Sequence, residues 1–222
     1  MDRIGTRIGI LGGTGAAGSA LGARLASVGY PVVLGSRSAE RARETADRVR
    51  ATWTHVSLDI TGGDNDAAAA CDIVVIATPW DSAATTAKEY ERDLHGKVVV
   101  CMANALVRVG PEFQPLVPPR GSVAAHVGAA VPGCRLVAAL HHLPAKELGN
   151  ITHSLDSDVL ICSDDPAATE EVARLVERIP GCRPLDAGEL SNAMAIEAFT
   201  AVLLQLNMKY KTRVAPRLTG IR

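Results

Sequence analysis

Aromatic side chains are scarce in this chain of 222 residues, where Phe, Trp and Tyr together make up 3% of the sequence. So few flat side chains leave little surface on which single-stranded bases could stack. The formal net charge is −1 at pH 7, so the chain also lacks the basic field that draws proteins to nucleic acids or anionic membranes. We therefore expect neither nucleic acid nor a membrane as a partner.

Long apolar runs, an export signal and paired cysteines are also missing. No stretch reaches the roughly 18 uninterrupted apolar residues of a membrane span, and the first residues do not read as a signal peptide. The cysteines are odd in number, scattered and free of any C-x-x-C pair: Cys71, Cys101, Cys134, Cys162 and Cys182. We expect reduced, mostly buried thiols in a cytoplasmic protein, in preference to disulfides or a metal site.

What the chain does contain is a regular alternation of short apolar runs and helical patterns. Strand-like runs occupy residues 7–11, 31–36, 55–60, 72–78 and 97–102. Helical patterns lie between them at about 16–28, 39–50, 65–70 and 81–93. Strands that are apolar on both faces and alternate with helices predict a parallel sheet covered on both sides.

The C-terminal part continues this pattern after a proline-rich segment, residues 110–122, which predicts a linker. Helices are expected at 122–131 and 166–179, strands at 135–142, 158–163 and 183–187, and a long helix at about 189–211. The prediction is therefore an α/β fold: a Rossmann-type, doubly wound, mainly parallel sheet with a small C-terminal α/β region.

Residues 13–18, Gly-Thr-Gly-Ala-Ala-Gly, fit the pattern G-x-G-x-x-G between a predicted strand and a predicted helix. Gly13 would allow the tight turn, Gly15 would let a pyrophosphate approach the backbone, and Gly18 would let helix and strand pack closely. The helix N-terminus would offer N–H groups and partial positive charge to the phosphates. A glycine-rich turn without a ligand is the alternative, but the strand–turn–helix context favours dinucleotide binding.

The second strand-like run ends in Ser36-Arg37, and Arg41 follows one helical turn later. An NAD site would place Asp or Glu here, to accept hydrogen bonds from the ribose hydroxyls. A hydroxyl and two guanidinium groups instead suit a 2′-phosphate, through charge-assisted and bidentate contacts. The pattern favours NADP over NAD.

The fourth strand-like run ends in Thr78-Pro79-Trp80, near the topological switch of such a sheet. The nicotinamide half of the cofactor should run past this point. Trp80 would then cover the ribose or the ring. A surface aromatic at a helix start is the alternative interpretation.

These residues, together with several C-terminal motifs, resemble the NADPH-dependent reductases of coenzyme F420, the F420H2:NADP oxidoreductases. The motifs are GGTGAAG, GSRSAER, ATPW, AALHHLPA, SDVLICSDD and RPLDAGELSNAMAIEAFTAVLLQLN, and the resemblance runs from Arg7 to the final TGIR. It implies a Rossmann protein, usually homodimeric, that passes a hydride between NADP(H) and the 8-hydroxy-5-deazaflavin coenzyme F420. It also implies an NADP-binding domain over 1–142 and a small C-terminal domain over 143–222 that contributes to the deazaflavin site and dimer interface.

The resemblance assigns the two cofactors to separate sets of residues. The NADP contacts fall on Thr14, Gly15, Ala16, Ala17, Ser36, Arg37 and Arg41, with Trp80 matching the family's PW motif, and the deazaflavin contacts fall on Asn104, Leu106, His141, Ala145 and Ser191. Arg41 stands where the family usually has lysine. Asn104 departs from the family's proline and small apolar residues, which leaves the pocket's shape and the acceptor open.

No serine–lysine, tyrosine–lysine or other acid–base constellation accompanies these motifs. Hydride transfer between two cofactors needs none at the bond-breaking step, because the protein supplies alignment, dryness and electrostatics. His141 is the one candidate catalytic residue, and a plain core histidine is its alternative. No metal is expected at His141-His142, because adjacent residues on a strand point to opposite faces.

Two other functions stay open. A reductase of another small acceptor, such as an imine or a quinone, would need an acid, for which only His141 or Glu197 is available. A non-catalytic NADP sensor would bind the cofactor without turning it over.

The last predicted helix and the chain end raise questions of their own. The helix is apolar on almost every side, which predicts burial within its own subunit and in a dimer: Ile196, Phe199, Val202, Leu203, Leu204 and Leu206. Basic residues then end the chain, either as a solvated end or as a ligand-facing patch: Lys209, Lys211, Arg213, Arg217 and Arg222.

Overall fold

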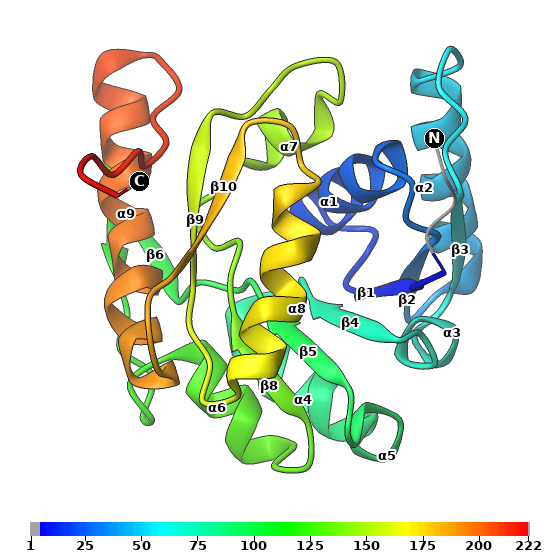
Figure 1. Cartoon of the computed structure of the whole chain (residues 1–222), viewed down its shortest axis with the longest axis horizontal. Helices are drawn as coiled ribbons and strands as arrows, with labels where there is room; N and C mark the ends of the chain where they lie inside the picture. The colour runs from blue at the N-terminus through cyan, green and yellow to red at the C-terminus, as the bar shows by residue number, and fades with distance from the viewer. Residues whose placement is uncertain (1–4, 222) are drawn as a thin grey trace.

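A six-stranded, fully parallel sheet forms the centre of the computed structural model, which describes residues 5–221 (Figure 1). Residues 1–4 and 222, which the predicted domain limits include, lie outside the described residues. The strands of the sheet are β1 (Ile8–Leu11), β2 (Val32–Ser36), β3 (Ile60–Asp64), β4 (Ile73–Ile76), β5 (Val98–Cys101) and β8 (Arg135–Ala138). They lie in the order β3-β2-β1-β4-β5-β8. The chain therefore grows outward in both directions from β1, which confirms the predicted doubly wound α/β fold.

Helices cover both faces of this sheet. They are α1 (Ala16–Ser27), α2 (Ala39–Thr52), α3 (Asn65–Ala69), α4 (Trp80–Glu89), α5 (Glu91–Leu94) and α6 (Val123–Ala130). One apolar cluster joins Leu21 and Leu25 of α1 to one face, and a second joins Ala83 and Val127, from α4 and α6, to the other. These two buried clusters explain why the central strands are apolar on both faces.

Three predicted elements differ from the structure. The strand expected at 55–60 lies at Ile60–Asp64 instead, because Gly62 there passes so close to α2 that a Cβ would lie 2.1 Å from the Ala42 carbonyl. The predicted linker, residues 110–122, includes the strand β7 (Glu112–Pro115). This strand forms an antiparallel hairpin with β6 (Leu106–Val109), which lies just before the linker, and Gly110 at the turn is in the left-handed region. The strand expected at 135–142 ends at Ala138.

The C-terminal region packs directly on the six-stranded sheet. It consists of α7 (Ala145–Gly149), β9 (Ser157–Ile161), α8 (Pro166–Glu177), β10 (Cys182–Asp186), a 3-10 turn η1 (Leu190–Asn192) and α9 (Ala193–Tyr210). The strands β9 and β10 pair in parallel, and an antiparallel bridge between Ala138 and Cys162 links them to β8. Val159 and Val172 join the same apolar cluster as the β1 residues, so both regions share a core.

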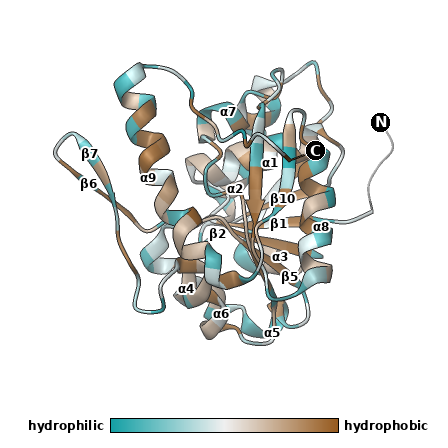
Figure 2. Ribbon diagram, turned by 60° about the vertical axis from the view of Figure 1, so that its left-hand side comes forward, coloured by the Kyte–Doolittle hydropathy of each residue, from teal (hydrophilic) through white to brown (hydrophobic). Residues whose placement is uncertain are grey.

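Helix α9 lies at one side of the molecule, next to the β6–β7 hairpin (Figure 2). Ile196 and Leu203 are buried on its inner face, while Phe199 and Val202 are 40% and 50% exposed. Within residues 5–221, no helix is long and apolar enough to cross a membrane.

Candidate functional site

The glycine-rich turn connects β1 to α1 at the carboxyl edge of the sheet. Its left-handed residue is Gly12 (φ 81°), so the prediction that Gly13 makes the tight turn is wrong. Gly13 instead packs on β2, where its N–H donates to the Gly35 carbonyl at 2.9 Å. At Gly18 a Cβ would lie 2.5 Å from the Gly12 carbonyl oxygen, whereas at exposed Gly15 it would meet only that oxygen, at 3.3 Å. The open side of Gly15 is therefore where a phosphate can approach the backbone.

The N-terminus of α1 has no side-chain cap, unlike those of α2, α6 and α8. Its N-cap is Gly15, and the next residue, Ala16, is exposed. Helix α2 shows the contrast, since its N-cap Ser38 accepts from the Arg41 N–H at 3.3 Å. Uncapped and accessible N–H groups at a helix N-terminus suit an anion, so the turn fits a pyrophosphate.

The end of β2 presents Ser36, Arg37 and Arg41 beside this turn. Both arginines are exposed, and neither makes an ion pair within residues 5–221. Asp64 pairs with Ser36 in the sheet register, but its carboxylate caps α3 by accepting the Ala67 N–H at 2.9 Å. Two free guanidinium groups and a partly exposed hydroxyl therefore meet where a 2′-phosphate would lie.

The end of β4 lies directly across from the turn, since a Cβ on Gly12 would be 2.8 Å from Thr78 N. The Thr78 hydroxyl is buried and has no hydrogen-bond partner within the described chain. Pro79 then precedes Trp80, the partly buried first residue of α4, which packs on the second apolar cluster. The unpartnered hydroxyl provides a donor and an acceptor where the cofactor is expected to pass.

Beyond β4, the structure brings Asn104 and His141 together. The Asn104 side-chain amide donates to the His141 carbonyl at 2.8 Å, across segments that follow β5 and β8. Thr200 of α9 contacts the same pair, with its hydroxyl 3.3 Å from Asn104 Oδ1 and 3.5 Å from the His141 carbonyl oxygen. The polar residue that departs from the family pattern thus positions the backbone of His141.

The imidazole of His141 is 4% exposed, and neither ring nitrogen has a hydrogen-bond partner of acceptable geometry among residues 5–221. Burial lowers its pKa to about 3, with the neighbouring His142 adding to the shift and the backbone of Met102 and Ala103 opposing it. The ring is therefore neutral at physiological pH. It can exchange one hydrogen bond with a ligand, but it is not a cationic acid.

The adjacent His142 ring lies in a separate network, with Nε2 2.7 Å from the Asp158 carbonyl oxygen. The Asp158 carboxylate is buried and accepts from Arg183 at 2.8 Å, which holds its pKa below the ordinary value. It also accepts from Arg217 and from the Leu218 N–H. Arg217 in the basic chain end therefore fixes the C-terminal segment to β9.

Glu197 is a second buried polar residue on the inner face of α9. Its carboxylate accepts from the N–H groups of Val123 and Ala124, at 2.8 and 3.0 Å, at the start of α6. Burial raises the pKa of this carboxyl to about 7. Because both oxygens bind backbone donors, Glu197 anchors α6 and is not placed as a general acid for an imine.

The remaining predicted deazaflavin residues lie on three different elements. Leu106 begins β6, Ala145 begins α7, and Ser191 is exposed in η1. Ser191 lines a groove of about 410 Å³ with Arg120 and Met194. Apart from the Asn104–His141 contact, no hydrogen bond links these predicted residues to one another in the described chain.

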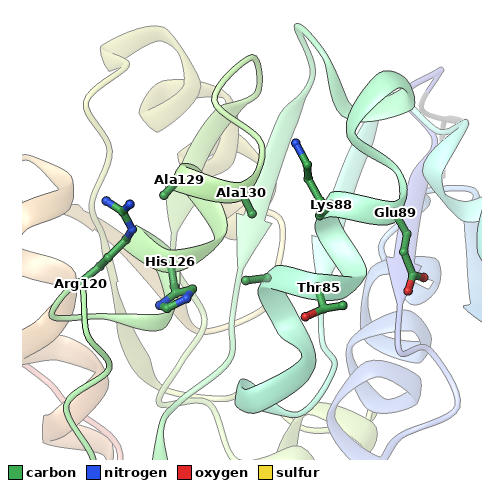
Figure 3. Close-up of a pocket in the computed structure, with 8 residues that line it drawn as sticks. Thr85, Lys88, Glu89, Arg120, His126, Ala129 and Ala130 are labelled. Atoms are coloured by element: carbon green, nitrogen blue, oxygen red, sulfur yellow. The ribbon is translucent and has the colours of Figure 1, made fainter.

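A different pocket, of about 470 Å³, lies between α4 and α6 (Figure 3). Lys88 and Thr85 of α4 face Arg120 and His126 across it, and none of its lining residues is a predicted site residue. It lies away from the glycine-rich turn, so we do not assign the dinucleotide to it. Among residues 5–221, no group of three His, Cys, Asp or Glu side chains could hold a metal ion.

Sequence reasoning missed two residues that shape this site, Arg24 and Thr200. Arg24 of α1 is fully buried, and its guanidinium donates to backbone carbonyls between Glu147 and His153, which fixes the end of α7 and the segment that follows it. Arg24 could have been found in the sequence as a charged residue in an otherwise apolar helix. Thr200 could have been found as a polar residue three positions after Glu197, within a run of apolar residues.

Comparison with known proteins places this chain beside one family. Residues 7–105 match the family model described as NADP oxidoreductase, coenzyme F420-dependent. The F420-dependent NADP reductases of Methanocaldococcus jannaschii and Methanothermobacter thermautotrophicus are 35% and 32% identical, over 97% of this chain and over 97% and 94% of their own lengths. A crystal structure from Arthrobacter sp. FB24, 23% identical, shares the fold with a TM-score of 0.77 and covers 96% of this chain and all of that one.

Proposed function

We propose, because this chain belongs to the family of coenzyme F420-dependent NADP oxidoreductases, that it transfers a hydride reversibly between NADP(H) and the 8-hydroxy-5-deazaflavin coenzyme F420. The observation that carries this function is the end-to-end match to reductases of that name, at 32–35% identity over 97% of the chain. It is an NADP-dependent oxidoreductase, and its co-substrates are NADP(H) and F420.

For NADP(H), we propose the edge formed by the glycine-rich turn, the end of β2 and the end of β4. The residues are Gly13, Thr14, Gly15, Ala16, Ala17, Ser36, Arg37, Arg41, Thr78, Pro79 and Trp80. The open side of Gly15 and the uncapped α1 N-terminus support the pyrophosphate position. Arg37 and Arg41, which are exposed and make no ion pair within residues 5–221, support the 2′-phosphate position.

For the deazaflavin, we propose the neighbouring edge, with Asn104, Leu106, His141, Ala145 and Ser191. The ring nitrogens of His141 lie near the backbone of Met102 and Ala103 but form no well-aligned hydrogen bond within residues 5–221, which supports a polar ligand atom there, because a buried donor without a partner is costly. In this division, residues 1–142 hold NADP(H), and residues 143–222 complete the deazaflavin site.

The two bound co-substrates supply the redox chemistry, as hydride donor and hydride acceptor. The chain's own residues bind, orient and exclude water. Buried Met102, Ala103 and Leu140 flank His141 and keep this edge apolar. The neutral His141 ring can donate one hydrogen bond to the deazaflavin, while Asn104 and Thr200 hold its backbone in place.

We also propose that the chain forms a homodimer through α9 and the β6–β7 hairpin. Both carry exposed apolar side chains, which soluble monomers rarely gather in one place: Val107, Val109, Met194, Phe199 and Val202. Light scattering should give twice the chain mass at micromolar concentration, and Val202→Glu should lower it. A monomeric wild-type chain would contradict the dimer.

The test of the function is an absorbance assay with purified chain, NADPH and one acceptor at a time. We expect loss of the oxidised deazaflavin band with F420, and little turnover with a cyclic imine or a quinone. NADH should serve poorly. Faster turnover of the imine or quinone than of F420 would contradict the proposal, and binding of NADPH without any turnover would indicate a sensor.

A further inference from the structure

A groove of about 490 Å³ lies between the α7 segment and the end of α9. It is lined by Pro144, Lys146 and Glu147 on one side and by Asn207, Lys211, Thr212 and Arg213 on the other. Two contacts keep it in shape. Arg213 forms an ion pair with Glu147, and the Val214 N–H donates to Asn207 Oδ1 at 2.5 Å.

The charges in this groove are unbalanced. Among its lining residues in the described part of the chain, Glu147 is the one acid; its side chain is 11% exposed and is already paired with Arg213. Lys146 and Lys211 are exposed, and neither makes an ion pair within residues 5–221. Two unpaired ammonium groups on facing walls favour an anion with more than one negative charge.

The groove also lies next to the proposed deazaflavin site. Pro144 and Lys146, which line it, flank Ala145, and His141 lies just before them in the chain. Lys211 and Arg213, which belong to the basic chain end, line this groove, so that part of the chain end is not simply solvated. The dipole of α9 favours a positive charge at Lys211, which caps its C-terminus, and Lys146 likewise lies in the last turn of the five-residue α7.

We propose that this groove binds the acidic tail of the deazaflavin co-substrate, as a chain of carboxylates, with Lys146 and Lys211 as the residues that select for it. The proposal rests on the proposed function, since it needs the ring to lie near His141 and Ala145. A tail held here lies apart from Arg37 and Arg41, so the two anionic ligands do not compete.

The experiment compares F420 carrying several glutamates with the tail-free 8-hydroxy-5-deazariboflavin, using the full chain and NADPH. In the Lys146→Gln/Lys211→Gln variant, KM for tailed F420 should rise roughly tenfold at low salt, and less at 0.5 M salt. KM for the tail-free deazaflavin, KM for NADPH and kcat should stay within about twofold. The matched control is Lys209→Gln, because Lys209 lies beside the Tyr210 ring and outside the groove.

Each outcome decides the proposal. Equal KM changes for tailed and tail-free substrates, or an equal change in Lys209→Gln, would overturn the groove while leaving the proposed function intact. A KM for NADPH that rises with the double variant would mean that the lysines serve the dinucleotide. A wild-type chain that reduces neither deazaflavin would overturn the proposed function, and the groove's assignment with it.

Discussion

The edge proposed for NADP(H) gathers its phosphate-facing groups from one continuous stretch, residues 12–41, whereas the edge around His141 draws on four separate segments. At the first edge, the β1–α1 and β2–α2 turns alone position the backbone N–H groups and the exposed guanidinium groups. In the second, Asn104 reaches a residue 37 positions away, and Thr200 one 59 positions away. A phosphate site of the proposed kind needs only local structure, whereas the edge proposed for the deazaflavin depends on contacts between segments far apart in the sequence.

Arg24 is where the two regions meet, and its removal should have the largest effect. Its fully buried guanidinium binds carbonyls between Glu147 and His153, with distances from 2.6 to 3.5 Å. Arg24→Met should lower the free energy of unfolding by about 3–5 kcal/mol, because these carbonyls lose their partners. Denaturant unfolding measures this. Arg174→Met, at an exposed 3.7 Å ion pair, should cost below about 0.5 kcal/mol. Equal losses would mean that Arg24 is not the anchor.

Glu197, which anchors α6, gives the stability of the fold a pH dependence. Its pKa is about 7 in the folded chain and 4.5 as an ordinary carboxyl, so between these values only the unfolded state loses its proton. Stability from this group is thus full below pH 4.5 and is lost as pH rises to 7, by up to about 3 kcal/mol. His141, with its pKa lowered to about 3, acts in the opposite direction over pH 3 to 6.5.

The comparison of wild type with Glu197→Gln isolates the glutamate, because His141 is common to both. The variant should become relatively more stable as pH rises from 4.5 to 7, by up to about 3 kcal/mol. Chemical unfolding across this range gives the difference. A stability gap that does not change with pH would contradict the raised pKa.

Arg37→Ala should damage the local edge alone. Loss of one charge-assisted contact to the 2′-phosphate should raise KM for NADPH by roughly 10- to 100-fold. KM for NADH and for F420 should change by less than about threefold. Glu40→Ala, an exposed neighbour on α2, is the control. Equal losses for NADPH and NADH would overturn the 2′-phosphate assignment.

Thr200→Val should produce the smallest change, and only at the other edge. The hydroxyl contacts at 3.3 and 3.5 Å are long, so their loss should cost about 1 kcal/mol or less. KM for F420 should rise roughly two- to fivefold, with KM for NADPH unchanged. Thr85→Val on α4 is the control. A larger effect on NADPH than on F420 would mean that the two edges are not separable in this way.

The same contrast explains what could be predicted from the sequence. Alternating apolar runs predicted the parallel sheet, and the spacing from Gly13 to Arg41 predicted the cofactor edge, because both are local patterns. The prediction of a strand at 55–60 was wrong because it followed the apolar residues of that run. It did not consider Gly62 and Gly63, which allow close contact with α2 and α3. The prolines of residues 110–122 predicted a linker, but β7 of the β6–β7 hairpin lies there.

The residues proposed for the deazaflavin edge come from sequence motifs, but the local structure around His141 could not be predicted from them. The strand expected at 135–142 stops at Ala138, and Leu140 adopts φ 68°, so His141 is placed by Asn104 and Thr200 and not by the sheet. No pattern along the chain shows that Glu197 holds α6, because that contact spans 74 positions.

The central claim is that the chain aligns two co-substrates for direct hydride transfer while its own groups stay out of the bond-breaking step. NADPH deuterated at the transferred C4 position tests it, with mass spectrometry of the deazaflavin formed in ordinary water. We predict one deuterium in each reduced deazaflavin and none in the solvent, because the hydride passes directly between the co-substrates and neither His141 nor Glu197 takes part in its transfer. Label that appears in the water, or an unlabelled product, would contradict the account.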